Sequence, residues 1–223
     1  MGQGVESAMP DQAQEAAASK PRRRQARGER RAAQLLDAAA VVFAEVGYTA
    51  ASTNAIAREA GVSPGTLYQF FPNKEAIAVE LGGRLLEQWR TTNGRALSPE
   101  NVQLPLAQMV DAMVDPLLEF NSRNPAFHVL MHGPDSPGQV TEAFETLHGA
   151  VCRRIEELLA LYLPDTPKSE ITIFANTVLA LFKAGLDLLA VHQDEQAAYR
   201  TELKRALFRY LDPVIGDCLP PGP

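Results

Sequence analysis

Apolar side chains recur at three- and four-residue steps along most of the chain, which is the spacing of one face of an α-helix. The first such stripe lies in residues 30–46, and Gly47 ends it because glycine readily takes the left-handed conformation that follows a helix. Further stripes predict helices over about residues 53–60, 64–70, 73–92, 104–122, 126–131, 139–163, 169–192 and 195–211. No stretch carries a convincing strand pattern. The sequence therefore predicts an all-α fold.

Residues 53–74 predict two short helices joined by a tight turn. Gly61 ends the first helix, and Ser63 can accept hydrogen bonds from the free N–H groups of the second. Pro64 fits the first position of the second helix, where a missing N–H costs nothing. Two helices joined in this way form the helix-turn-helix, whose second helix enters the major groove of DNA.

Four pieces of sequence follow one another around this turn: LDAA (36–39) with FAEVGY (43–48), IA (56–57), AGVSPGTLY (60–68) and FPNKE (71–75). In this order and spacing they resemble the DNA-binding domain of the TetR/AcrR family of bacterial transcriptional regulators. The resemblance implies a three-helix DNA-binding domain at residues 29–89, with the helix-turn-helix at residues 52–71. It also implies a C-terminal effector-binding and dimerisation domain at residues 90–223. Residues 1–28 lack apolar periodicity and predict a disordered arm with a basic end.

The second helix of the turn supplies groups that can contact bases, with small residues where backbone and DNA meet. Gly65 permits close approach, Thr66 can bond a base edge or a phosphate or touch a thymine methyl, and Gln69 can pair with adenine. Asn54 lies where some family members carry a base-reading arginine. Phe70 lies where they often carry a polar residue or histidine, so we expect it to pack on a sugar or base.

Phosphate contacts are expected from Thr53, Tyr68 and Lys74, as the resemblance implies. Thr53 and Ser63 would also serve as helix caps in any protein, whereas Tyr68 and Lys74 have little evident structural purpose. The residues expected to contact DNA are Thr53, Asn54, Ser63, Pro64, Gly65, Thr66, Tyr68, Gln69, Phe70 and Lys74.

The net charge of −6 is unevenly distributed along the chain. Residues 20–90 hold 11 Lys/Arg against 7 Asp/Glu, a net +4, and residues 91–223 hold 10 against 17, a net −7. A basic module therefore adjoins an acidic one, which phosphate would repel. The basic cluster at residues 21–27 is either a solvated tail or an arm that neutralises phosphates or enters a minor groove.

The C-terminal region is rich in methionine and aromatic residues, and the family resemblance implies a small-molecule effector there. We expect a lipophilic pocket, although each residue taken singly is more often ordinary core. The residues expected to line the pocket are Trp89, Met109, Met113, Phe120, Phe127, Met131 and Phe144.

Residues 169–192 carry two apolar stripes, and a helix of this kind is buried on more than one side. The family resemblance implies a homodimer in which the last two helices pack against their counterparts; burial within a monomer is the alternative. The residues expected at the dimer interface are Ile173, Thr177, Ala180, Ala184, Leu203, Leu207 and Tyr210.

Other chemistry finds little support in the sequence. His128 and His132 have helical spacing, but no acidic residue completes a zinc motif, and no catalytic or cofactor fingerprint is present. Cys152 and Cys218 share no motif, which favours a free thiol in a reducing compartment. We therefore expect no enzyme activity, no metal and no cofactor. The chain also lacks a signal-peptide core and about eighteen consecutive apolar residues, so we expect a cytoplasmic protein without a membrane partner, nucleoid-associated when bound to DNA.

These patterns together predict a repressor that leaves a palindromic operator in double-stranded DNA when a small molecule binds. An activator of the same fold is an alternative. A helical small-molecule-binding or enzyme domain, with the basic module serving only for interaction, is a second alternative.

Overall fold

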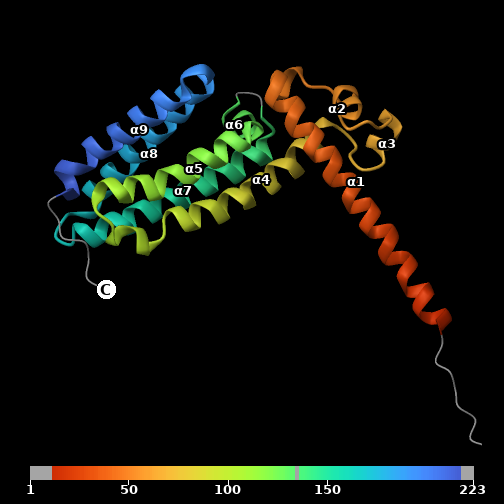
Figure 1. Ribbon diagram of the computed structural model, residues 1–223, viewed down its shortest axis with the longest axis horizontal. Helices are drawn as coiled ribbons and strands as arrows, with labels where there is room; N and C mark the ends of the chain where they lie inside the picture. Colours follow the sequence, from red (N-terminus) through yellow and green to blue (C-terminus); the bar gives the residue numbers. More distant parts are fainter. Residues whose placement is uncertain (1–11, 134–135, 217–223) are drawn as a thin grey trace, which may run out of the picture.

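The computed structural model describes residues 12–133 and 136–216, and these residues form helices without a strand (Figure 1). The prediction of an all-α fold is confirmed. The helices are α1 (Gln12–Ala50), α2 (Thr53–Glu59), α3 (Pro64–Tyr68), α4 (Lys74–Ala96), α5 (Leu106–Arg123), α6 (Pro125–His132), α7 (Gly138–Tyr162), α8 (Lys168–Val191) and α9 (Gln196–Leu211). Three shorter helical turns, η1 (Pro99–Gln103), η2 (Gln193–Glu195) and η3 (Asp212–Gly216), connect or end them.

The N-terminal head consists of α1, α2, α3 and the first turns of α4. Helices α2 and α3 have only 7 and 5 residues, so most of their stability comes from packing an apolar face rather than from intrinsic helix propensity. The side chains that meet at its centre are fully buried: Leu35, Phe43, Ile56, Leu67 and Ile77. This core fixes the angle at which α2 and α3 stand on α1.

Helix α1 is longer than the sequence predicted. It kinks at Gly47, which has φ 76°, so the predicted stop is present at that residue. At its other end it begins at Gln12, whereas we expected a disordered arm as far as residue 28. Extending a helix that is already formed costs far less than nucleating one, and residues 12–20 are mostly good helix formers. Residues 1–11 of the expected arm lie outside the described residues.

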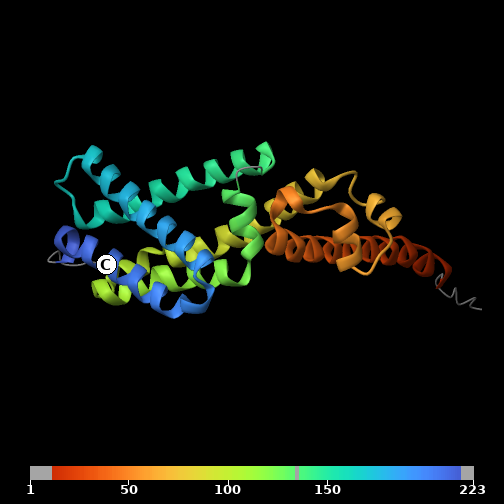
Figure 2. The same cartoon turned by 90° about the horizontal axis from the view of Figure 1, so that it is seen from above.

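The C-terminal body is a bundle in which α5 and α7 pack against α4, α9 packs against α5, and α8 contacts α7 and α9 (Figure 1; Figure 2). Short α6 packs against α1, α4 and α7, so it bridges head and body. Helix α4 runs on to Ala96, past the domain boundary expected at residue 89. The two domains therefore share one continuous helix.

Candidate nucleic-acid interface and ligand cavity

The turn between α2 and α3 is built from local hydrogen bonds. Ser52 caps α2 by accepting from the N–H of Ala55 at 3.1 Å, so the cap is Ser52 rather than Thr53. Gly61 has φ 65°, and Ser63 caps α3 by accepting from the N–H of Thr66 at 3.1 Å. These contacts hold α3 on the surface with one side open.

The open side of α3 carries the polar groups that the sequence singled out. Tyr68 is 51 % exposed although it is a large aromatic residue, and its hydroxyl lies 3.0 Å from Thr53 Oγ1. The hydroxyls of Ser63 and Thr66 share a second hydrogen bond of 2.9 Å. Two pairs of hydroxyls are thus fixed in place along one short helix and the start of α2.

Gly65 has no packing reason to be glycine. A Cβ built there would meet only Ser63 Oγ, at 3.8 Å, which is an ordinary contact. Asn54 and Gln69 are exposed, whereas Phe70 is half-buried and packs against the core of the head. Phe70 therefore has a structural purpose in addition to the DNA contact expected of it.

Lys74 also has a structural purpose that the sequence did not suggest. Its Nζ donates to the main-chain oxygens of Tyr48 at 2.8 Å and Thr49 at 3.0 Å. It also lies 4.5 Å from the centre of the Tyr48 ring, within the range of a cation–π interaction. Burial first, and then the charge of Glu75, raises the pKa of Tyr48 above its usual value. Lys74 thus joins the start of α4 to the end of α1.

Two further contacts of the head were missed by the sequence. Gln34 Nε2 donates to the main-chain oxygen of Ala60 at 2.7 Å, which satisfies a carbonyl at the end of α2. Arg84 and Asp37 form an ion pair of 2.5 Å between α4 and α1. Neither pair has a sequence signal, because each joins residues 26 or 47 positions apart.

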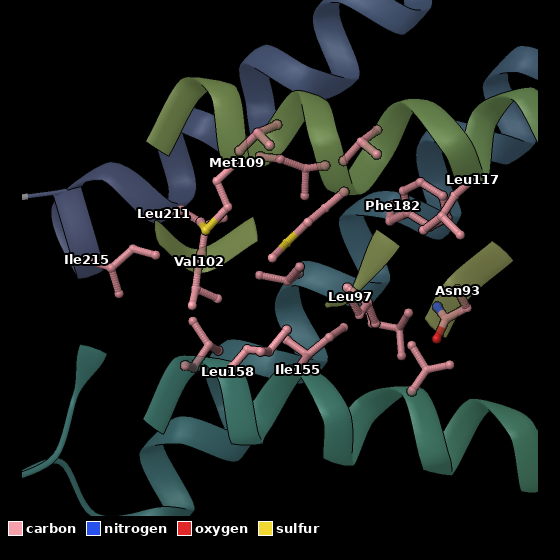
Figure 3. A pocket seen from close by; sticks show the side chains of 18 of the residues that line it. Asn93, Leu97, Val102, Met109, Leu117, Ile155, Leu158, Phe182, Leu211 and Ile215 are labelled. Atoms are coloured by element: carbon pink, nitrogen blue, oxygen red, sulfur yellow. The ribbon is translucent and has the colours of Figure 1, made fainter. Parts of the chain in front are cut away.

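The body encloses an apolar cavity of about 110 Å³ between α4, α5, α7, α8 and α9 (Figure 3). Of the residues expected to line a pocket, Trp89, Met109 and Met113 do so. Phe127 and Phe144 line a smaller hollow of about 50 Å³ that also touches Trp89. The structure adds lining residues that the sequence did not assign to the pocket: Asn93, Leu117, Val151, Tyr162, Phe182 and Leu207. One of them, Leu207, was expected at the dimer interface instead.

The other two residues expected in the pocket are buried in the core of the body. Phe120 packs edge-on against Phe127, with ring centres 5.1 Å apart. Met131 lies at the contact between α6 and α4, where its terminal methyl group is 3.6 Å from a Cβ built on Gly82. Both side chains pack against protein atoms, and neither is among the lining residues of the described hollows.

The histidine pair and the cysteines add no second site. His128 Nε2 lies 3.9 Å from Asp187 Oδ1, and the side chain of His132 is outside the described part of the chain. The Cys152 thiol donates to Asn176 Oδ1 at 3.2 Å, and burial first raises its pKa. In residues 12–133 and 136–216, no three His, Cys, Asp or Glu side chains gather as metal ligands. Cys218 lies beyond the described residues.

Helix α8 leaves an apolar stripe uncovered. Ile173 is 62 % exposed, and Ala180 and Ala184 are exposed further along the same side, with Thr177 partly exposed between them. The stripe ends at Leu188 and Val191, of which Val191 is 76 % exposed. By length and composition α8 could also cross a membrane, which is weak evidence, and it is the one helix of the described residues that could.

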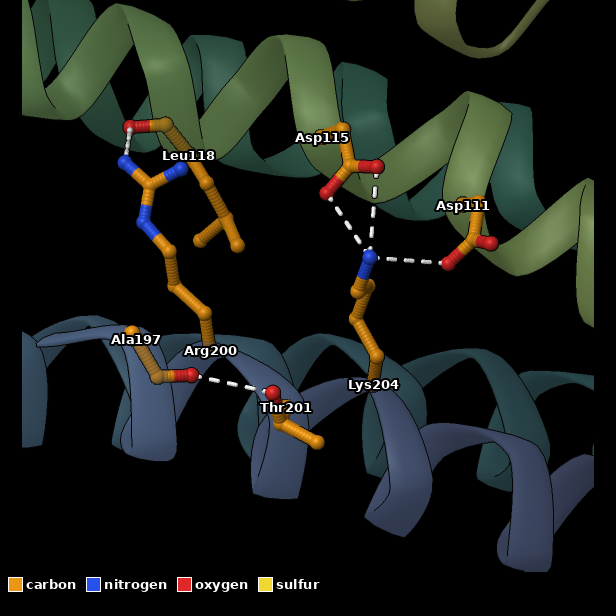
Figure 4. A network of polar contacts seen from close by, with 7 residues as sticks. All are labelled: Asp111, Asp115, Leu118, Ala197, Arg200, Thr201 and Lys204. Carbon is orange, nitrogen blue, oxygen red and sulfur yellow. Dashed lines mark hydrogen bonds and ion pairs between the residues drawn. The ribbon is translucent and has the colours of Figure 1, made fainter.

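Helix α9 contributes less to that surface than the sequence predicted. Leu203 and Leu207 are 6 % and 2 % exposed, because they face α8 and the cavity of their own subunit. Tyr210 is half-buried. Elsewhere on α9, Lys204 forms ion pairs with Asp111 and Asp115 of α5 (Figure 4).

Comparisons with known proteins agree with this architecture. Residues 35–81 match the family described as "Bacterial regulatory proteins, tetR family", and residues 105–211 match "Tetracyclin repressor-like, C-terminal domain". Together these matches cover both the head and the body. The chain belongs to the TetR family.

Two curated relatives and one solved structure illustrate the similarity. The HTH-type transcriptional regulator YhgD of Bacillus subtilis is 34 % identical over 86 residues, which are 39 % of this chain and 44 % of YhgD. The HTH-type transcriptional repressor KstR of Rhodococcus jostii is 39 % identical over 89 residues, which are 38 % of this chain and 42 % of KstR. The chain thus spans less than half the length of either relative. The structure of MexZ, a repressor of Pseudomonas aeruginosa, shares the fold with a TM-score of 0.63 at 18 % identity, over 87 % of this chain and all of MexZ.

Membership in the TetR family limits the functional classes to which this chain can belong. Proteins of this family are DNA-binding transcriptional regulators and not enzymes. They act as dimers, binding of a small ligand is typical of them, and they are typically cytoplasmic. A TetR-family regulator needs a DNA-reading surface, a dimer surface and a ligand site, and α3, α8 and the cavity are candidates for these.

Proposed function

We propose that this chain is a sequence-specific repressor that binds a palindromic operator as a homodimer and leaves it when a lipophilic small molecule binds. The course of α4 carries the proposal. This helix begins at Lys74 beside the helix-turn-helix, and its second half lines the cavity through Trp89 and Asn93. A ligand that favours one position of α4 therefore also favours one position of the head.

The exposed side of α3 supports the DNA-binding part of the proposal. Thr66 and Gln69, with Asn54 of α2, read base edges in the major groove. The shared hydroxyls of Thr53 and Tyr68 bind a phosphate. Ser63, Pro64 and Gly65 let the backbone at the start of α3 approach the DNA, since Gly65 meets no packing atom that a side chain would disturb.

Lys74 and Phe70 are both expected to contact DNA, and both also make contacts within the head. Lys74 already donates two hydrogen bonds within the head, so its third N–H is the one left for a phosphate. Phe70 offers only the exposed part of its ring to a sugar or base. The basic residues at the start of α1 add electrostatic attraction to the backbone.

The uncovered stripe of α8 supports the dimer. Ile173, Thr177, Ala180 and Ala184 form its first half, and contact with the same stripe of a second copy removes it from water. Two copies related by a twofold axis present two α3 helices to successive major grooves. The operator is therefore palindromic.

The test measures DNA binding and ligand response in one assay. A labelled fragment from upstream of the protein's own gene is titrated with the full chain, and fluorescence anisotropy follows binding against random competitor DNA. Lipophilic compounds are then added, and those that raise the melting temperature are expected to lower DNA affinity at least tenfold. Specific DNA bound no better than random DNA contradicts operator binding, and compounds that stabilise the protein without releasing DNA contradict the effector mechanism.

A paired substitution separates base reading from phosphate binding. Thr66→Ala is expected to cost about 1–3 kcal/mol at one base pair of the operator and nothing on random DNA. Lys74→Ala is expected to weaken binding to all sequences and to lower the salt slope by about one. Equal losses for both variants on specific and random DNA would refute the assignment of Thr66.

A further inference from the structure

One polar group in the cavity has no partner. Asn93 lies in the last turn of α4 and is only 9 % exposed. Its side-chain nitrogen Nδ2 is buried and makes no hydrogen bond within the described residues. An unpaired buried donor lowers stability, so its presence in a native core calls for something outside the fold that satisfies it.

The surroundings of Asn93 are mostly apolar. Asn93 lies at one end of the cavity near Leu117 and Phe182, and Ile215 lies at the other end (Figure 3). Trp89 and Tyr162 are the other lining side chains that carry a polar group, and the Tyr162 hydroxyl already donates to the main-chain oxygen of Val102. No charged side chain lines the cavity in the described part of the chain.

We propose that the effector is an uncharged lipophile with one hydrogen-bond acceptor at its buried end, and that Asn93 Nδ2 donates to that acceptor. A ketone, ester or amide oxygen fits this description. A carboxylate does not, because a buried anion is costly without a cation to pair with, and the described lining holds none. This inference rests on the proposed function in taking the cavity as the effector site.

The shape of the cavity determines which end of a bound ligand lies at Asn93. A cavity of about 150 Å³ lined by Leu, Ile and Phe holds benzene, so a cavity of about 110 Å³ holds a smaller apolar group, and a longer ligand extends beyond it. A second hollow of about 290 Å³ shares Met109, Tyr162 and Ile215 with it and continues to exposed Gln103 and Gly216. A longer ligand therefore enters past Ile215 with its acceptor end leading, and its remainder lies toward Gln103.

The test compares three seven-carbon probes on the full chain: 2-heptanone with a neutral acceptor, heptane with none, and heptanoate with a charged one. Trp89 is the one tryptophan of the chain and lines the cavity, so its fluorescence reports occupancy. Each probe is titrated against the natural chain and against Asn93→Leu, which keeps the number and branching of the side-chain heavy atoms and removes the donor. Val110→Ala, in the apolar wall, is the matched control.

On the natural chain, 2-heptanone is expected to bind at least tenfold more tightly than heptanoate. In Asn93→Leu, the affinity of 2-heptanone relative to heptane is expected to fall about fivefold, which corresponds to one hydrogen bond of about 1 kcal/mol. Val110→Ala is expected to weaken 2-heptanone and heptane alike. Asn93→Leu without ligand is expected to melt at a higher temperature than the natural chain.

The assignment is overturned if Asn93→Leu leaves the ratio unchanged, if heptanoate binds as tightly as 2-heptanone, or if none of the three probes changes Trp89 fluorescence. The comparison of 2-heptanone with heptanoate needs no variant, so it stands even where Asn93→Leu fails to fold. DNA release is scored separately by anisotropy. Binding of 2-heptanone through Asn93 without DNA release contradicts the proposed function alone, and DNA release by heptane with an unchanged ratio contradicts this inference alone.

Discussion

The two halves of α4 lie in different surroundings. On the side of the head, Ile77 and Leu81 of α4 are fully buried in the hydrophobic core. In the body, Trp89 and Asn93 border a cavity of about 110 Å³. A close-packed region has one arrangement, whereas a region with a cavity can respond to whatever fills it. The same helix thus joins a rigid DNA-reading unit to a part of the protein whose packing is completed by a ligand.

The largest effect expected from this contrast is on stability. Phe43 is fully buried in the head, so Phe43→Ala is expected to lower the free energy of unfolding by about 3–5 kcal/mol. Met113 borders the cavity and has fewer atoms around it, so Met113→Ala is expected to cost less than about 2 kcal/mol. Urea unfolding measures both values. Equal losses in the two variants would show that the body is packed as closely as the head.

The body is nevertheless tight where α8 meets α9. A Cβ built on Gly185 lies 2.5 Å from both terminal carbons of buried Leu203, so Gly185→Ala is expected to cost about 1–3 kcal/mol. Gly83 of α4 is the control, because a Cβ there meets no atom within 4 Å and alanine is the better helix former. Gly83→Ala is expected to gain about 0.5–1 kcal/mol. Thermal unfolding compares the two variants, and a Gly185→Ala protein as stable as Gly83→Ala contradicts the close contact.

Lys74 of the head has both a structural role and an expected role in DNA binding, and substitutions can separate the two. Lys74→Met removes two hydrogen bonds to main-chain oxygens and is expected to cost about 1–2 kcal/mol of stability without DNA. Arg58→Met removes the same charge from the exposed side of α2 and is expected to leave stability within about 0.5 kcal/mol. Chemical denaturation of both variants is the measurement. Unchanged stability of Lys74→Met would mean that Lys74 serves DNA binding alone.

Contacts between residues close together in the chain could be predicted from the sequence, whereas contacts between distant residues could not. The cap at Ser63 and the stop at Gly47 depend on residues a few positions away, so the helix-turn-helix could be predicted from the sequence. The structural hydrogen bonds of Lys74, in contrast, go to main-chain carbonyls 25 and 26 positions away in the chain. Whether the Leu207 side chain faces the cavity or the surface depends on how α9 is rotated against α8. Local spacing contains neither kind of information.

The residues that line the cavity could likewise be predicted from the sequence only in part. Methionine and aromatic content predicted an apolar interior and placed Trp89, Met109 and Met113 correctly at its edge. It could not show that Phe120 packs against protein atoms, because that depends on where α6 crosses α5. The sequence also gave no signal for Asn93, since an asparagine on a helix is usually solvated.

The smallest effect expected concerns the link between α9 and α5 (Figure 4). The hydrogen bond that Lys204 donates to Asp111 is the main reason that the pKa of Lys204 is raised above its usual value. Burial opposes this effect, and a second bond that Lys204 donates to Asp115 adds to it. Asp111 and Asp115 are 57 % and 52 % exposed, so Lys204→Met is expected to cost less than about 1 kcal/mol at pH 7. A lysine whose pKa is raised by folding stabilises the protein below its unfolded pKa of about 10.4, and this contribution disappears as the pH rises through the folded pKa. Urea midpoints of the natural chain and Lys204→Met should therefore differ at pH 7 and converge as the pH rises through the folded pKa of Lys204. A difference of the same size below and above that pKa would mean that Lys204 contributes through the packing of its alkyl chain rather than through its charge.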